Sequence, residues 1–247
     1  MRGPLIGPML GEFMGTLVLI LLGDGVVAGV LLKKSKGENA GWLAITTGWA
    51  LAVVAGIFTA VAFGSPGAHI NPAITLAVAL GSGNWSFVAL FWLAQMSGAF
   101  AGASLVWLAY LPHWRETPDS GTKLAVFCNS PAIRRFPSNL LTEIIATACL
   151  VVVGFSFGSK AVSAIGLAAG FVPSLWGMLV WAIGLSLGGP TGYALNPARD
   201  LGPRLAHAIL PISGKGGSDW RYSWVPVAGP LIGAAIGSLI IQAAGIN

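Results

Sequence analysis

The tripeptide Asn-Pro-Ala occurs twice in this chain of 247 residues. Asparagine is a favoured helix N-cap, and proline is pre-organised for the first helical position, where its missing N–H costs nothing. Each copy therefore predicts the start of a short helix, which we expect to run to about Leu80 in the first case and about Ala208 in the second. The residues of the two copies are Asn71, Pro72 and Ala73, and Asn196, Pro197 and Ala198.

Three ionisable side chains lie inside apolar surroundings. Arg199 follows Asn196 by three residues, in the first turn of the second expected helix. An arginine in such a setting is expensive unless it faces water or a partner, so its default interpretation is functional. Glu12 and Glu143 lie in apolar runs without a nucleophile or a metal-binding pattern beside them. We therefore predict no catalytic residue, no metal ion, no cofactor and no enzymatic activity.

The composition indicates whether water or lipid surrounds this protein. Charged residues make up 9% of it, against about 25% in ordinary globular domains, and hydrophobic residues make up 55%. The mean hydropathy is +0.79, which excludes a soluble domain and also disorder, since disorder requires low hydrophobicity and high charge. The net charge of +5 does not indicate a nucleic-acid partner, because the basic residues are scattered between apolar runs. The composition predicts a polytopic protein embedded in the lipid bilayer.

A helix needs about 20 apolar residues to cross the hydrocarbon core. The connections 64–85, which holds no charge, and 188–220, which begins as an apolar, glycine-rich segment, carry the two Asn-Pro-Ala copies. Their short helices would reach about 15–20 Å at 1.5 Å per residue, half of the membrane. The six stretches long enough to span are 5–32, 41–63, 86–110, 139–158, 162–187 and 223–245.

Three blocks of sequence recur in the same order, so the chain consists of two related halves. Glu12 corresponds to Glu143, and the first Asn-Pro-Ala corresponds to the second. Each half holds three spans, and an odd number inverts the second half relative to the first, which places the functional site near the bilayer midplane. The matching blocks are 11–23 with 142–154, 67–77 with 192–202, and 97–103 with 228–234.

Inversion of the halves would bring the two half-helices together, N-terminus to N-terminus, at the centre of the bilayer. Each helix N-terminus carries about half a positive charge. The junction is therefore expected to repel cations, hydronium included, while the amides of Asn71 and Asn196 donate hydrogen bonds to a passing oxygen. This arrangement predicts a lane for uncharged molecules.

With these motifs the chain resembles the aquaporin family (major intrinsic proteins), and most of all its glycerol-facilitator, or aquaglyceroporin, branch. The resemblance implies an all-α membrane protein with an aquaporin-like inverted repeat, six transmembrane helices and two re-entrant half-helices, assembled as a homotetramer with one pore in each subunit. It also implies a single channel domain, 1–247, with halves of about 1–111 and 139–247, a loop of about 112–138, and half-helices of about 71–80 and 196–208. The segments that carry it are GEFMGT (11–16), GAHINPA (67–73), GPTGYALNPARD (189–200), GGSDWRYSWVP (216–226) and VPVAGPLIGAAIG (225–237).

The resemblance also assigns a selectivity filter. Arg199 belongs to the outer constriction, where its N–H groups bind solute oxygens and its charge excludes cations. Tyr193 matches the aromatic filter residue, and Gly184 matches a position that is histidine in many water-selective members, so we expect the glycine to leave room for a wider solute. Trp49 matches the tryptophan of the second span.

The position in the second span has an alternative. The segment between Trp49 and Asn71 is two residues longer than usual for the family. If the extra residues lie in the loop at 64–66, Trp49 keeps its place; if they lie in the helix, Leu51 takes it, about 200° around the helix. Trp49 is the preferred assignment, because loops absorb insertions more readily than packed spans.

By the same resemblance, Glu12 and Glu143 accept hydrogen bonds from the non-helical backbone before each half-helix. These backbone groups would otherwise be stranded in hydrocarbon. Asp24 has no repeat partner, and we expect it near a membrane face in a solvated or capping role. The backbone carbonyls implied to line the pore are those of Gly67, Ala68, His69, Ile70, Gly192, Tyr193, Ala194 and Leu195.

The function expected from this resemblance is passive diffusion of glycerol and other small uncharged solutes, with water, while ions and protons are excluded. One alternative is a water-selective pore, against which Gly184 argues. The other is a secondary transporter with an inverted repeat, which would need ionisable groups at the midplane beyond the two glutamates.

The family has both termini in the cytoplasm and resides in the cell membrane. The positive-inside rule argues against that topology here, since nine basic residues fall in the connections expected outside and only Arg2 and Lys160 inside. We retain the family orientation, because the match covers the full length of the chain. The nine are Lys33, Lys34, Lys36, Arg115, Lys123, Arg134, Arg135, Lys215 and Arg221.

Overall fold

A computed structural model describes residues 6–162, 164–168 and 170–246, and within these ranges the regular structure consists of ten α-helices. The helices are of two kinds, long apolar segments and short helices that either stop inside the molecule or lie in a loop. Their bounds are α1 Ile6–Leu31, α2 Gly41–Ala62, α3 Pro72–Ser82, α4 Val88–Ala109, α5 His113–Glu116, α6 Ser120–Phe127, α7 Phe136–Ser156, α8 Val172–Leu187, α9 Pro197–Ile209 and α10 Val225–Ala243.

Five of these helices, α1, α2, α4, α7 and α10, are long and apolar enough to cross a membrane. The sixth, α8, has 16 residues and reaches about 24 Å at 1.5 Å per residue. The prediction that this span begins at residue 162 is wrong, because the helix begins at Val172, with Pro173 in its first turn. The preceding apolar segment forms turns, with Gly166 at a φ of +81°, and part of it (163 and 169) lies outside the described residues.

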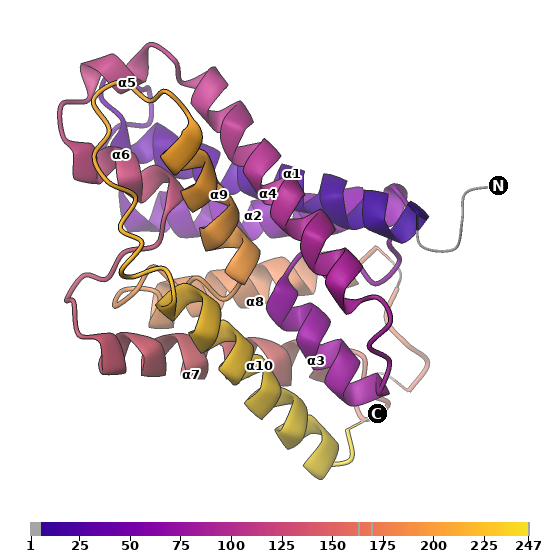
Figure 1. Ribbon diagram of the computed structural model, residues 1–247. Helices are drawn as coiled ribbons and strands as arrows, with labels where there is room; N and C mark the ends of the chain where they lie inside the picture. Colours follow the sequence, from indigo (N-terminus) through magenta and orange to yellow (C-terminus); the bar gives the residue numbers. More distant parts are fainter. Residues whose placement is uncertain (1–5, 163, 169, 247) are drawn as a thin grey trace.

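The helices form two groups of three, and each half-helix is inserted into the opposite group. In the first group α1 packs against α2 and α4, and in the second α7 packs against α8 and α10. The half-helix α9 of the second half packs against α4, whereas α3 of the first half packs against α10. In Figure 1 α3 and α9 point toward each other near the centre of the molecule, and the start of α1 and the end of α10 lie at the same end.

Glycine allows the helices within each group to approach closely. A Cβ on Gly102 of α4 would lie 2.5 Å from the carbonyl oxygen of Leu17 in α1, and one on Gly233 of α10 would lie 2.5 Å from that of Ile144 in α7. Both distances are too short for a real side chain. Small residues such as these two glycines allow membrane helices to pack backbone to backbone.

Replacing Gly102 by alanine should therefore destabilise the fold. The added methyl group must push α1 away from α4, and overpacking of this kind costs about 1–3 kcal/mol. The measurement is the thermal unfolding temperature of the purified variant in detergent. Gly81→Ala, at a glycine whose Cβ would meet nothing within 4 Å, is the matched control, and equal unfolding temperatures for the two variants would contradict the packing argument.

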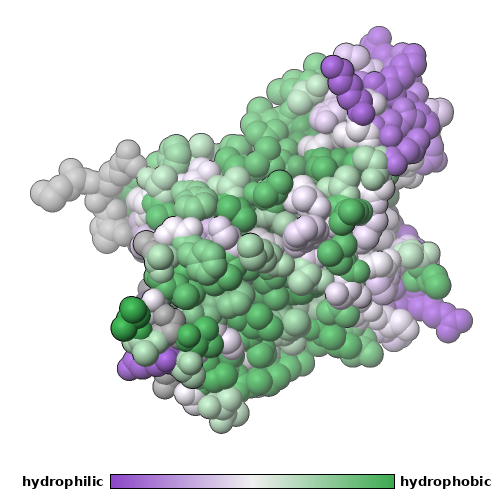
Figure 2. Space-filling model, turned by 180° about the vertical axis from the view of Figure 1, so that it is seen from behind, coloured by the Kyte–Doolittle hydropathy of each residue, from purple (hydrophilic) through white to green (hydrophobic). Residues whose placement is uncertain are grey.

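The flank of the molecule is apolar, and its hydrophilic residues lie toward the two ends. Figure 2 shows hydrophobic residues covering the flank, larger hydrophilic patches at one end and a smaller one at the other. Large apolar side chains such as Leu93, Met178 and Leu239 are exposed on the long helices. An exposed apolar surface on this scale indicates contact with lipid or a partner, and together with the spanning helices it defines a multi-pass membrane protein.

Candidate functional site

The two half-helices begin with the same N-cap arrangement. The Asn71 side chain accepts a hydrogen bond from the backbone N of Ala73 at 2.8 Å, and the Asn196 side chain accepts one from Ala198 at 2.9 Å. In both helices the proline that follows the asparagine occupies the first turn. An asparagine N-cap followed by proline therefore starts a helix in both halves, as the sequence predicts.

The same asparagines tie the half-helices together. The Asn71 Nδ2 donates to the carbonyl oxygen of Leu195, and the Asn196 Nδ2 donates to that of Ile70, each at 2.9 Å. Each amide has a second N–H, which these bonds leave free for another acceptor. The two positive helix ends are thus held next to each other inside the protein, as in the central region of Figure 1.

The backbone before each half-helix is strained in a repeated pattern. Ala68 and Ile70 have φ values of +40° and +44°, and Tyr193 and Leu195, which correspond to them in the repeat, have +39° and +56°. A left-handed conformation at a residue other than glycine costs about 1–3 kcal/mol and persists only where the surroundings enforce it. The sequence did not indicate this strained backbone, because none of the four residues is a glycine, the residue type that adopts a positive φ most readily.

Glu12 enforces the conformation in the first half. Its Oε1 accepts hydrogen bonds from the Ser65 hydroxyl at 2.7 Å and the His69 backbone N at 2.8 Å. Its Oε2 accepts from the Ile70 backbone N at 2.6 Å and the Gln95 amide at 2.8 Å. The carboxylate is fully buried, and its bonds satisfy donors that a membrane interior could not.

Glu143 occupies the equivalent place in the second half with fewer partners. Its two oxygens accept hydrogen bonds from the backbone N of Ala194 at 3.0 Å and of Leu195 at 3.2 Å. Both glutamates thus bind the strained segment that precedes a half-helix. Neither lies in a group of residues able to hold a metal ion, since the described part of the chain contains no such group.

Two cavities lie beside these segments. The larger, of about 680 Å³, is lined by both Asn71 and Asn196, and the smaller has about 230 Å³. Trp49, Tyr193 and Arg199 line both cavities, so we infer that these three side chains form a constriction where the two adjoin.

The constriction is built from packed aromatic rings and a guanidinium group. The Arg199 Cζ lies 4.3 Å from the centroid of the Trp49 ring, a cation–π distance. Leu51 is 63% exposed on the outer side of α2, so of the two alternatives in this span it is Trp49 that lies at the constriction. Behind it, the Trp42 ring meets Tyr193 edge-on at 5.7 Å, and the Trp42 Nε1 donates to the Gly184 carbonyl at 3.1 Å. Trp42 was not singled out from the sequence.

Gly184 makes room for a side chain of the protein and does not itself line either cavity. A Cβ at this position would lie 2.8–3.0 Å from atoms of the Tyr193 ring. The space that a side chain at Gly184 would occupy is taken by the tyrosine ring, which forms the wall. That this arrangement leaves room for a wider solute stays a prediction.

The eight carbonyls expected along the pore are not all free. Those of Ile70 and Leu195 accept the asparagine amides described above, and that of Gly192 accepts the Asn129 side chain at 2.7 Å. A carbonyl oxygen has a second lone pair, so these three can still accept a solute hydroxyl. Gly192 lines the smaller cavity, and Gly67, Ala68, His69, Tyr193 and Ala194 line the larger one.

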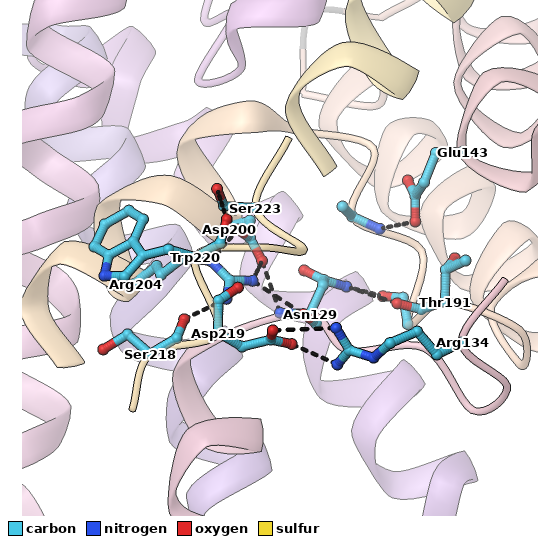
Figure 3. A network of polar contacts seen from close by, with 12 residues as sticks. Asn129, Arg134, Glu143, Thr191, Asp200, Arg204, Ser218, Asp219, Trp220 and Ser223 are labelled. Atoms are coloured by element: carbon cyan, nitrogen blue, oxygen red, sulfur yellow. Dashed lines mark hydrogen bonds and ion pairs between the residues drawn. The ribbon is translucent and has the colours of Figure 1, made fainter. Parts of the chain in front are cut away.

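A polar network that sequence reasoning missed braces the outer end of the site (Figure 3). The buried Arg204 donates to both oxygens of Asp200 at 2.8 Å and to the Asn129 carbonyl at 3.0 Å. The Asn129 backbone N donates to Asp200 at 2.8 Å, and an exposed Arg134–Asp219 ion pair lies beside it. The loop between α6 and α7 is thereby fixed to α9 next to the smaller cavity.

In the described part of the chain, five helices long enough to cross a membrane, the shorter apolar helix α8 and two half-helices joined at their N-termini define a membrane channel of the aquaporin type. The chain belongs to the major intrinsic protein family, whose model, described as "Major intrinsic protein", matches residues 3–241. This membership places it among passive channels and facilitators, which are not enzymes.

The relatives agree with this assignment. The chain is 58% identical to the "Probable glycerol uptake facilitator protein" of Thermotoga maritima over 93% of this chain and 95% of that one. It is 54% identical to "Glycerol uptake facilitator protein 3" of Lactiplantibacillus plantarum over 98% of each, and 39% identical to the "D/L-lactic acid transporter" of the same organism over 94% and 95%. Among solved structures, the aquaglyceroporin from Plasmodium falciparum matches with a TM-score of 0.84 and 28% identity over 96% of this chain and 95% of that one.

Proposed function

We propose that the protein is a passive channel for glycerol and other small uncharged solutes, that water passes through the same pore, and that ions and protons are excluded. The observation that carries this proposal is the constriction of Trp49, Tyr193 and Arg199 between two cavities. The names of the relatives that are 58% and 54% identical support glycerol as the solute.

The constriction is an amphipathic slot that matches a polyol on two sides. The rings of Trp49 and Tyr193 suit a carbon backbone, whereas the Arg199 guanidinium and the nearby carbonyls suit hydroxyl groups. Beyond the slot, the free N–H groups of Asn71 and Asn196 receive the solute oxygens. Cations meet the guanidinium charge and two positive helix ends, and the slot offers no replacement for a hydration shell.

The alternatives have less support. A secondary transporter would need ionisable groups available at the midplane, and Glu12 and Glu143 are already engaged in holding the backbone. A water-selective pore would be narrower, whereas Gly184 sets the Tyr193 ring back against α8. On these grounds we assign the selectivity filter to Trp49, Tyr193 and Arg199, with Gly184 as the residue that makes room for the Tyr193 ring. We assign the pore motif to the two Asn-Pro-Ala copies.

The assembly we propose is a homotetramer of single-domain channels, 1–247, in the plasma membrane with both termini in the cytoplasm. The start of α1 and the end of α10 lie at the same end of the molecule, which supports two termini on the same side of the membrane. The excess of basic residues at the opposite end argues against a cytoplasmic location of the termini. Protease added to intact cells is expected to cleave within 112–138. Protection of that loop, together with cleavage at the termini, would reverse the orientation.

The channel proposal is tested by solute flux into vesicles that contain the purified protein. Light scattering should report glycerol uptake that rises linearly with glycerol concentration, does not depend on a sodium or proton gradient, and has a low activation energy. A panel of glycerol, urea, lactic acid, dihydroxyacetone and water ranks the solutes. Uptake that saturates at low concentration, or that a gradient drives, would identify a transporter instead.

A further inference from the structure

Trp42 lies in the first turn of α2 and belongs to the wall of the smaller cavity. It precedes Trp49 by seven residues, or about two turns of an α-helix, so both side chains project from the same face of α2. Trp49 contributes to the constriction, whereas no sequence motif assigns a role to Trp42. Its role follows from the contacts of its ring.

The indole ring of Trp42 connects α2 to α8 and to the segment before α9. Its Nε1 donates a hydrogen bond to the carbonyl oxygen of Gly184 at 3.1 Å. That carbonyl belongs to the last turn of α8, where helix carbonyls lack a donor within the helix. The Trp42 ring also meets the Tyr193 ring edge-on, with the centroids 5.7 Å apart and an angle of 82° between the planes. Aromatic pairs attract each other in this geometry.

Two glycines at the end of α8, Gly184 and Gly188, leave the space that the two rings occupy. A Cβ on Gly188 would lie 2.5 Å from the Tyr193 Cδ1 and 2.8 Å from the Trp42 Cζ2. A Cβ on Gly184 would lie 2.8 Å from the Tyr193 Cζ. The Tyr193 ring is therefore in contact both with bare backbone at the end of α8 and with the Trp42 ring.

Packing alone determines where the Tyr193 ring lies. Its hydroxyl oxygen is buried and has no hydrogen-bond partner among the described residues, so no hydrogen bond of the side chain orients the ring. The Trp42 ring, in contrast, is fixed by its bond to the Gly184 carbonyl. A ring that is held by a hydrogen bond thus supports a ring that is not.

We propose that Trp42 is a positioning residue that holds the Tyr193 ring in the constriction and in this way limits the width of the uncharged solutes that pass. The inference rests on the proposed channel function. Without the indole ring, the Tyr193 ring gains space to turn away from Trp49 and Arg199, because the vacated volume lies next to it. The slot then widens, and a solute broader than glycerol meets a lower barrier.

The test measures the uptake of glycerol and of pentaerythritol, a branched polyol broader than glycerol, into vesicles that contain wild type, Trp42→Ala or Trp85→Ala. The ratio of pentaerythritol flux to glycerol flux should rise several-fold in Trp42→Ala. It should not change in Trp85→Ala, because the Trp85 ring is 53% exposed in the connection between α3 and α4 and lines neither cavity. A role of Trp42 in folding alone lowers both fluxes in proportion, so an unchanged ratio in Trp42→Ala would overturn the proposal.

Tyr193→Ala shows whether Trp42 acts through the tyrosine ring. This variant lacks the ring that Trp42 holds, so its flux ratio should already be raised, and the addition of Trp42→Ala should change it little further. Two residues in contact show such non-additive effects, whereas independent sites do not. Effects that multiply in the double variant would mean that Trp42 acts on the solute by another route, and they would refute the positioning role.

Trp42→Phe keeps the proposal testable if Trp42→Ala does not fold. Phenylalanine places an apolar ring beside Tyr193 but has no N–H for the Gly184 carbonyl, so the flux ratio should again rise, and a wild-type ratio would count against the proposal. Failure of the wild type to take up glycerol would instead refute the channel function itself. The unfolding temperatures then test the contact without flux, since losses that add up fully in Trp42→Phe combined with Tyr193→Ala would mean that neither ring supports the other.

Discussion

Replacing Glu12 by glutamine should destabilise the protein and reduce its glycerol flux. The carboxylate accepts four hydrogen bonds, two on each oxygen. In glutamine one oxygen becomes an NH₂ group that faces two donors. The Ser65 hydroxyl or the Gln95 side chain can turn to accept from it, but the backbone N–H on the same side, of His69 or Ile70, loses its acceptor. A buried donor without an acceptor costs about 1–3 kcal/mol, a considerable share of the about 5–15 kcal/mol by which proteins are stable.

The measurements are the yield of monodisperse protein in detergent, its unfolding temperature and its glycerol flux. Glu143→Gln should show a smaller effect in the same direction, since each of its oxygens accepts one backbone bond. Glu116→Gln, at an exposed ion pair with Lys34, is the control and should unfold like the wild type. If Glu12→Gln unfolded at the same temperature as this control, the strained loop would not depend on the carboxylate.

The elements that the sequence predicts well are those with a signal carried by local chemistry and repeated in both halves. Asparagine followed by proline specifies a helix start wherever it occurs, so α3 and α9 begin at the expected residues. The length of an apolar stretch identifies a membrane span, but it does not distinguish an apolar segment that forms turns from one that forms a helix. That is why the start of α8 was misplaced over the glycine-containing segment before Val172.

The parts that could not be predicted depend on contacts between distant segments. The left-handed backbone of Ala68 and Ile70 contradicts the preference of both residue types and exists because Glu12, far away in sequence, binds it. Asp24 has no repeat partner, which predicts a solvated or capping place near the membrane face; that expectation is wrong, because the side chain is fully buried in α1. A single sequence does not report which charges a fold brings together.

Gly184→His is expected to reduce glycerol flux by about tenfold or more and water flux by much less. Any Cβ at this position collides with the Tyr193 ring, which Trp42 supports from the other side. The ring must then move into the slot, toward Trp49 and Arg199. An added barrier of about 1.4 kcal/mol slows passage tenfold, and the wider solute meets more of that barrier than water does.

The control for this prediction is Gly189→Ala, at a glycine of the following turn whose Cβ would meet nothing within 4 Å; its fluxes should match the wild type. Adding Tyr193→Ala to Gly184→His removes the ring that is displaced, so the double variant should recover glycerol flux relative to Gly184→His. Equal losses of glycerol and water flux in Gly184→His would mean that the tyrosine wall does not select by size. Selectivity would then arise at the paired asparagines, where the lane passes the tips of α3 and α9.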